Sequence, residues 1–124
     1  MDNFTKAYIE AALWSSTDDA GEPLDRGDYE LAPETIAKMV DDCTRFRSEQ
    51  SAYLETDYRT RARAAHGCSA EESAGHDFWL TRCGHGAGFW DGDWQEPAAT
   101  KLTEASKAFG NVDLYIGDDG LIYS

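Results

Sequence analysis

The sequence feature that most constrains the fold is an apolar stripe that begins just after Pro33. Its side chains recur at three- and four-residue spacing, which places them on one face of an α-helix: Ile36, Met39, Val40, Cys43 and Phe46. Pro33 suits the first turn of a helix, and Glu34 favours the positive end of its dipole. We therefore expect an amphipathic helix that starts at Pro33 and runs past residue 50.

Two further segments have helical spacing. In residues 3–16 the apolar positions are Phe4, Tyr8, Ala11 and Ala12, and Asn3 is the expected N-cap. Another short helix is expected to open at Pro97 and to stop at Gly110, with an apolar face formed by Ala98, Leu102, Ala105 and Phe109. The stretch 17–31 is rich in glycine, proline and acidic residues, which predicts a loop.

Two segments are typical of β-hairpins. Residues 76–91 carry aromatic pairs on both sides of a Cys-Gly-His-Gly stretch, which predicts two strands joined by a glycine turn. In residues 112–124 a turn at Gly117–Gly120 would make Ile116 face Leu121, and Leu114 face Tyr123. The expected fold is a single α+β domain spanning 1–124, a small antiparallel sheet of two hairpins packed with about three helices, in the order α-α-ββ-α-ββ.

The chain is strongly acidic, with 24 acidic against 11 basic residues and a formal net charge of −13. This balance argues against direct binding to nucleic acid or to an anionic membrane, because both need a cationic surface. It favours a basic protein as partner. On the helices, part of the acidity is expected to pair locally with bases four residues later: Glu34 with Lys38, Asp41 with Arg45, Glu55 with Arg59, and Asp57 with Arg61.

The acidity from residue 18 to residue 34 lacks such partners, since seven acids face Arg26 alone. We therefore predict an acidic binding face formed by Asp18, Asp19, Glu22, Asp25, Asp28 and Glu30. Two smaller acidic groups lie near the two expected hairpins: Asp91, Asp93 and Glu96 near the first, and Asp113, Asp118 and Asp119 in the second. If the three groups converge, they present an anionic surface comparable in charge to a short run of nucleic-acid backbone.

The compartment follows from the cysteines and from the start of the chain. Three cysteines without a CxxC pair fit free thiols in a reducing cytosol. The sequence shows no basic leader followed by an apolar run, and no apolar stretch long enough to span a bilayer. We therefore expect a cytoplasmic protein.

The candidates for chemistry gather in residues 76–91. The GHGAG run resembles a phosphate-binding loop only superficially, because no lysine is adjacent and no helix is expected after it. The segment also holds possible metal ligands, but their spacing matches no known ligand pattern: His76, Cys83, His85 and Asp91. We predict no catalytic residue, no cofactor and no metal. The aromatic side chains here, Trp79 and Trp90 among them, form either core or an exposed contact patch.

The stretch HDFWLTRCGHGAGFWD, residues 76–91, resembles a motif of a family of small uncharacterised proteins encoded by bacteriophages and prophages. Residues 31–39 and 112–123 resemble the same family in the same order. Cys83 departs from the pattern, in which asparagine is expected. The resemblance implies a phage or mobile-element origin, and accessory proteins of this size and acidity are often inhibitors of host machinery.

Three functions stay open on the sequence. The first is a non-enzymatic phage accessory protein that acts in the host cytoplasm on a basic host or phage protein. In its sharpest version it is an acidic nucleic-acid mimic that inhibits a defence or DNA-binding protein. The second is a small-ligand or enzymatic site beside the aromatic hairpin; its principal residues are His76, Arg82 and Asp91, with Trp79, His85 and Trp90 around them. The third is a self-associating structural module.

Overall fold

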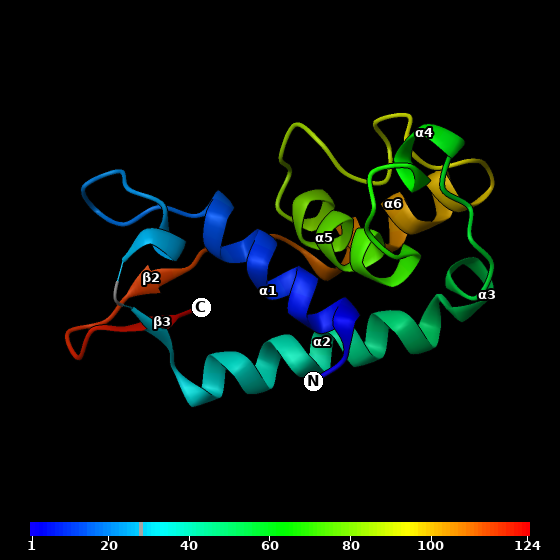
Figure 1. Cartoon of the computed structure of the whole chain (residues 1–124). Helices are drawn as coiled ribbons and strands as arrows, with labels where there is room; N and C mark the ends of the chain where they lie inside the picture. Colours follow the sequence, from blue (N-terminus) through cyan, green and yellow to red (C-terminus); the bar gives the residue numbers. More distant parts are fainter. Residues whose placement is uncertain (28) are drawn as a thin grey trace.

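The computed structural model describes residues 1–27 and 29–124, which form a helical body with a small sheet at one end (Figure 1). The elements, in chain order, are α1 (Asn3–Ser15), the 3₁₀ helix η1 (Leu24–Arg26), β1 (Glu30–Leu31), α2 (Pro33–Glu49), α3 (Ser51–Leu54), α4 (Arg61–Ala64), α5 (Ala70–Arg82), α6 (Ala98–Phe109), β2 (Tyr115–Ile116) and β3 (Leu121–Tyr123). The α+β class is confirmed, but the predicted element order, the count of about three helices, the purely antiparallel sheet and the first hairpin are wrong.

The periodic helices form where the apolar spacing predicts them. α1 and α6 agree with prediction within a residue or two, and α2 begins at Pro33. α2 ends at Glu49 rather than running past residue 50, and the short α3 follows it. The N-cap of α1 is Asp2 rather than Asn3, because the Asp2 carboxylate accepts a 2.8 Å hydrogen bond from the Thr5 N–H.

The segment predicted as the first hairpin begins with a helix, α5. Its start is a capping box: Ser69 Oγ accepts from the Glu72 N–H (3.1 Å), and the Glu72 carboxylate accepts from the Ser69 N–H (3.2 Å). Every residue from Asp77 to Arg82 is buried. Because most of α5 is buried, its sequence lacks the regular alternation of an apolar and a polar face that identifies surface helices.

The glycines after α5 end this helix instead of turning a hairpin. The His85 N–H donates to the Leu80 carbonyl (3.0 Å) and the Gly84 N–H to the Thr81 carbonyl (3.2 Å), the bonds of a Schellman motif. Gly84 has φ 70°, the left-handed conformation that this motif needs. GFWD then lies in an irregular loop, where the Phe89 N–H donates to Thr81 Oγ1 (3.1 Å).

Phe78, on α5, lies at the centre of the hydrophobic core. Its ring stacks on Phe46 of α2, with centroids 4.0 Å apart, and contacts Tyr8 of α1 (5.2 Å) and Phe109 of α6 (5.1 Å). One fully buried side chain therefore joins the four long helices. Of the aromatic residues expected in the first hairpin, Phe78, Trp79 and Phe89 are core residues, whereas Trp90 is exposed.

The sheet has the strand order β1-β3-β2, with β1 parallel and β2 antiparallel to β3. The second hairpin is confirmed, but its register is one residue from the predicted one: Ile116 pairs with Ile122, and Tyr115 with Tyr123. Gly120, at φ 80°, adds a left-handed residue after the turn, so the Gly117 N–H bonds the Leu121 carbonyl (2.8 Å). The parallel partner β1 was not predicted.

We expect Gly75→Ala to destabilise the fold strongly, because α1 and α5 touch at this residue. A Cβ there would lie 2.9 Å from the Phe4 carbonyl carbon and closer still to its oxygen. Overpacking of this kind costs about 1–3 kcal/mol or more in unfolding free energy, measurable by urea denaturation. Gly86→Ala is the control, since no atom lies within 4 Å of its Cβ position and its φ is outside the left-handed region. Equal effects of the two substitutions would contradict this account of the helix contact.

Candidate functional site

The acidic loop after α1 folds back around Asp18. The Asp18 carboxylate accepts hydrogen bonds from the N–H groups of Ala20 (2.9 Å) and Glu22 (3.0 Å), and Leu24 of η1 is buried in the core. Most of the predicted acidic face is exposed on this loop and on β1: Asp19, Glu22, Asp25 and Glu30. Asp28, the remaining predicted residue, lies outside the described residues. The loop is thus a folded, acidic surface.

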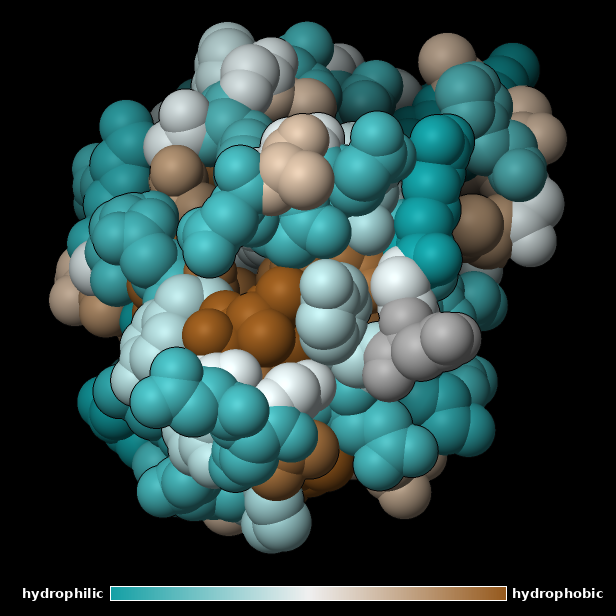
Figure 2. All heavy atoms as spheres, turned by 90° about the vertical axis from the view of Figure 1, so that its left-hand side faces the viewer, coloured by the Kyte–Doolittle hydropathy of each residue, from teal (hydrophilic) through white to brown (hydrophobic). Residues whose placement is uncertain are grey.

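Pairing of β1 with β3 brings this loop beside the second hairpin. Glu30 lies opposite Leu121, next to the turn in which Asp118 and Asp119 are exposed. We call the region formed by residues 17–31, the three strands and this turn the sheet end; it is on the left in Figure 1. Figure 2 looks onto it and shows hydrophilic side chains around a hollow with an apolar floor. Most of the first acidic group, and Asp118 and Asp119 of the second, therefore lie at one end of the molecule.

The third acidic group lies elsewhere, beside α4. Asp93 forms a 3.0 Å ion pair with Arg63 of α4, at the side of the molecule away from the sheet (Figure 1). Asp91 and Glu96 belong to the same segment. The three groups therefore do not converge on one surface.

The helical bases form tertiary rather than local ion pairs. Among the described residues, none of the four predicted acid–base pairs four residues apart lies within 4.0 Å. The ion pairs instead join distant segments: Arg47 with Asp2 and Glu71, Arg63 with Asp77 and Asp93, and Arg82 with Asp42. Arg59 pairs with Asp57, two residues before it. Several basic residues are therefore engaged within the helical body and are not available at the sheet end.

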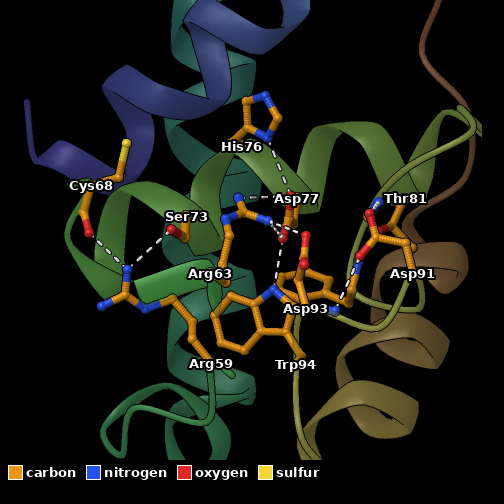
Figure 3. A network of polar contacts seen from close by, with 12 residues as sticks. Arg59, Arg63, Cys68, Ser73, His76, Asp77, Thr81, Asp91, Asp93 and Trp94 are labelled. Carbon is orange, nitrogen blue, oxygen red and sulfur yellow. Dashed lines mark hydrogen bonds and ion pairs between the residues drawn. The ribbon is translucent and has the colours of Figure 1, made fainter. Parts of the chain in front are cut away.

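Asp77 is the centre of a buried polar network (Figure 3). Its carboxylate, with 2% of the side chain exposed, accepts from Arg63 Nη1 (3.1 Å) and from the indole N–H of Trp94 (2.7 Å). His76 Nδ1 lies 3.2 Å from the other carboxylate oxygen. The network fastens α4 and the loop before α6 to α5.

Arg82 is buried on the other side of α5. Its guanidinium donates to Asp42 (2.8 Å), to the Tyr8 hydroxyl (3.1 Å) and to the carbonyls of Phe109 and Gly110. Burial alone would lower the pKa of Arg82, but its interactions with Tyr8 and Asp42 outweigh burial and raise it. These contacts hold helices together, so Arg82 is structural and is not part of a site with His76.

His76 and Asp91 do lie together, at a cavity of about 490 Å³ between α1, α5 and the loop after α5. Burial raises the pKa of the Asp91 carboxyl, which accepts from the N–H groups of Gly88 and Asp93 (both 3.3 Å). The wall on the α1 side includes Trp14, whose ring centroid is 5.9 Å from that of His76. Two of the three principal residues of the ligand-site hypothesis therefore share one cavity.

The other residues of the ligand-site hypothesis do not line this cavity. Trp79 is core, and its indole N–H donates to Ser15 Oγ (2.8 Å). Trp90 is 51% exposed. His85 is half-buried and lines a different cavity, of about 260 Å³, together with Cys83. Within residues 1–27 and 29–124, no three histidine, cysteine or acidic side chains are arranged to hold a metal ion.

Sequence reasoning missed three residues of this region: Trp14, Arg63 and Asp77. Arg63 was missed because the carboxylates that it pairs with, Asp77 and Asp93, are 14 and 30 residues further along the chain. Trp14 lies four residues after Glu10 on α1, and this helical spacing is the one signal that could have placed both at the same cavity.

Comparison with known proteins adds no identification. No family model matches the chain, and neither does any curated protein or solved structure. Across the part of the chain that the structure describes, no helix combines the length and apolar character needed to cross a bilayer. The functional argument therefore depends on the molecule's own geometry.

We expect Asp77→Asn to lower the free energy of unfolding by about 2–4 kcal/mol, because it leaves the largely buried Arg63 without its closest buried countercharge. Asp93→Asn removes a more exposed charge from the same arginine (40% side-chain exposure) and should cost below about 1 kcal/mol. Urea denaturation of both variants tests this, and equal losses would contradict a central role for Asp77.

The three thiols should differ in reactivity at pH 8. Burial raises the pKa of Cys43 to about 12 and also raises that of Cys83, so both stay protonated, whereas Cys68 is exposed. Peptide mapping by mass spectrometry after iodoacetamide treatment should find Cys68 modified first, and Cys43 modified only in denaturant. Cys68→Ser should abolish the fast modification. Early modification of Cys43 would show that α1 and α2 are not packed as described.

Proposed function

We propose that this chain is a non-enzymatic phage accessory protein whose sheet end binds a basic host or phage protein in the place of nucleic acid. The observation that carries the proposal is the charge of that end. Residues 17–31 and 115–123 hold eight acidic residues and one basic residue, Arg26. The cationic groove of a nucleic-acid-binding protein attracts closely spaced phosphates by their negative charge. Closely spaced carboxylates at the sheet end would be attracted to such a groove for the same reason.

The acidic surface is held on a fixed scaffold, which favours a specific partner over a diffuse charge effect. The Ala32 N–H and the Thr35 hydroxyl both donate to the Ile122 carbonyl (3.0 and 2.9 Å), so the start of α2 is tied to β3. Asp18 orders the loop by accepting two backbone hydrogen bonds. A surface that is ordered before binding loses less conformational entropy when a partner docks.

The apolar hollow in Figure 2 supports a protein as the partner. The exposed acids of the sheet end would steer a basic surface into place, and the apolar floor would then be buried by an apolar contact. The segments at this end contain no histidine and no cysteine, the residues that most often supply a general base or a strong nucleophile. Their chemistry therefore favours binding over catalysis.

Affinity capture from host lysate tests the proposal. The full chain should retain basic nucleic-acid-binding proteins that elute at moderate salt and are displaced by duplex DNA. A variant with four exposed acids neutralised, Asp19→Asn, Glu22→Gln, Asp25→Asn and Glu30→Gln, should weaken binding to the purified partner at least about tenfold, because each charge contributes to complementarity.

The matched control neutralises four exposed acids of the helical body: Asp41→Asn, Glu49→Gln, Glu55→Gln and Glu104→Gln. Both variants change the net charge equally, so only position differs. Retention of the partner by the sheet-end variant, or binding that ignores both salt and DNA, would overturn the proposal. Concentration-dependent light scattering without any partner would favour the self-associating module instead.

A further inference from the structure

The cavity beside His76 lies apart from the sheet end, and the proposed function makes no use of the residues that line it. Its volume of about 490 Å³ lies in the range of small-molecule sites. One wall is a single face of α1, where Glu10 and Trp14 are four residues apart. The facing wall is α5, where Glu72 and His76 have the same spacing. Asp91 closes the cavity from the loop after α5.

Trp14 presents a large apolar ring at this cavity. Its side chain is 51% exposed although the neighbouring α1 residues Ala11 and Ala12 are fully buried. The ring is tilted by 47° against His76, its aromatic neighbour. Tryptophan is the best aromatic residue for binding a cation, because the ring quadrupole is negative over the indole face.

The charges around the cavity also favour a cation. Five carboxylates line it, and Arg63 is the one lysine or arginine among the lining residues. Arg63 is already engaged by Asp77 and Asp93. The three other carboxylates, those of Glu10, Glu72 and Asp91, have no ion-pair partner within 4.0 Å among the described residues. Burial raises the pKa of Asp91, and a bound cation would relieve the cost of its ionisation.

The chemistry of these groups selects an organic cation rather than a metal ion. The carboxylates are distributed around the cavity, and no three of them meet as metal ligands within the described ranges. A guanidinium is flat, stacks on an indole, and has several N–H donors for separate carboxylates; an alkylammonium ion satisfies the same groups less completely. The ring supplies a stacking surface and the acids supply acceptors.

We infer that the cavity between α1 and α5 is a binding site for an organic cation of the guanidinium or alkylammonium class, with Trp14 as the stacking surface and Glu10 and Asp91 as acceptors. The cation is either a free small molecule or an arginine side chain of a bound polypeptide. Either source places a second binding site on the molecule, apart from the sheet end.

Calorimetric titration with Nα-acetyl-arginine amide tests the inference, with the neutral isostere Nα-acetyl-citrulline amide as the ligand control. The arginine derivative should bind at least about tenfold more tightly. The indole N–H resonance of Trp14, assigned by its loss in Trp14→Leu, should shift during the titration. Equal binding of the two ligands, or no detectable binding of either, overturns the inference.

Variants locate the site. Trp14→Leu and Glu10→Gln should each weaken binding of the arginine derivative, by about tenfold and about threefold, since they remove the stacking surface and one acceptor. Tyr115→Leu and Glu104→Gln remove an exposed aromatic and an exposed acid elsewhere, and should have no effect. Thermal melting confirms that each variant is folded. If the controls weaken binding as much as the cavity variants, the inference is wrong.

Two further titrations show whether the cation comes from a polypeptide or from a free small molecule. Tenfold tighter binding of the peptide Gly-Gly-Arg-Gly-Gly than of the amide supports a polypeptide ligand, whereas equal or tighter binding of spermidine supports a free amine. The sheet-end variant with four neutralised acids should bind the arginine derivative normally. This measurement separates the two proposals, because loss of the sheet-end function would leave binding of the arginine derivative unchanged.

Discussion

The buried guanidinium of Arg82 is the interaction on which the arrangement of the helices depends. From the last turn of α5 it reaches Tyr8 on α1, Asp42 on α2 and the carbonyls of Phe109 and Gly110 at the end of α6. Removing a charge from water is costly, and the cost is offset here because the donors have acceptors of suitable geometry. The guanidinium carbon of Arg82 also lies 5.4 Å from the ring centroid of Phe109, which packs against Phe78 of the core.

The ion pairs of arginines in the helical body affect how charge is distributed over the molecular surface. Arg63 and Arg82 neutralise buried or partly buried carboxylates, and Arg47 joins the start of α1 to α5. The sheet end has almost no basic residue of its own. A uniform-looking excess of acids in the sequence thus becomes an asymmetric molecule, in which several arginines are engaged within the helical body and the acids around the small sheet have almost no basic residue near them in the sequence. That asymmetry underlies the proposed function of the sheet end.

Sequence periodicity identified the elements that have one polar face. α1, α2 and α6 each expose one side to water, so their apolar residues repeat at helical spacing. α5 is mostly buried and was misread as a strand, although the Ser69–Glu72 capping box and Gly84 marked its two ends. For the site, local reasoning found His76 and Asp91 but also selected Trp79 and Arg82, which the fold uses for packing. Trp14 and Arg63 were missed because their partners are distant in the chain.

By itself the sequence determined the α+β class, the start of α2, the extent of α6 and the position of the second hairpin, because each depends on local spacing, caps and turn residues. Only the tertiary structure decided the pairing of β1 with β3 and the partners of the arginines. It also decided which acids gather, bringing most of the first group, and Asp118 and Asp119 of the second, to the sheet end. These outcomes depend on contacts between segments up to about ninety residues apart, such as Thr35 with Ile122, and no local pattern encodes them. The acidic character is a property of the sequence; the acidic face is a property of the fold.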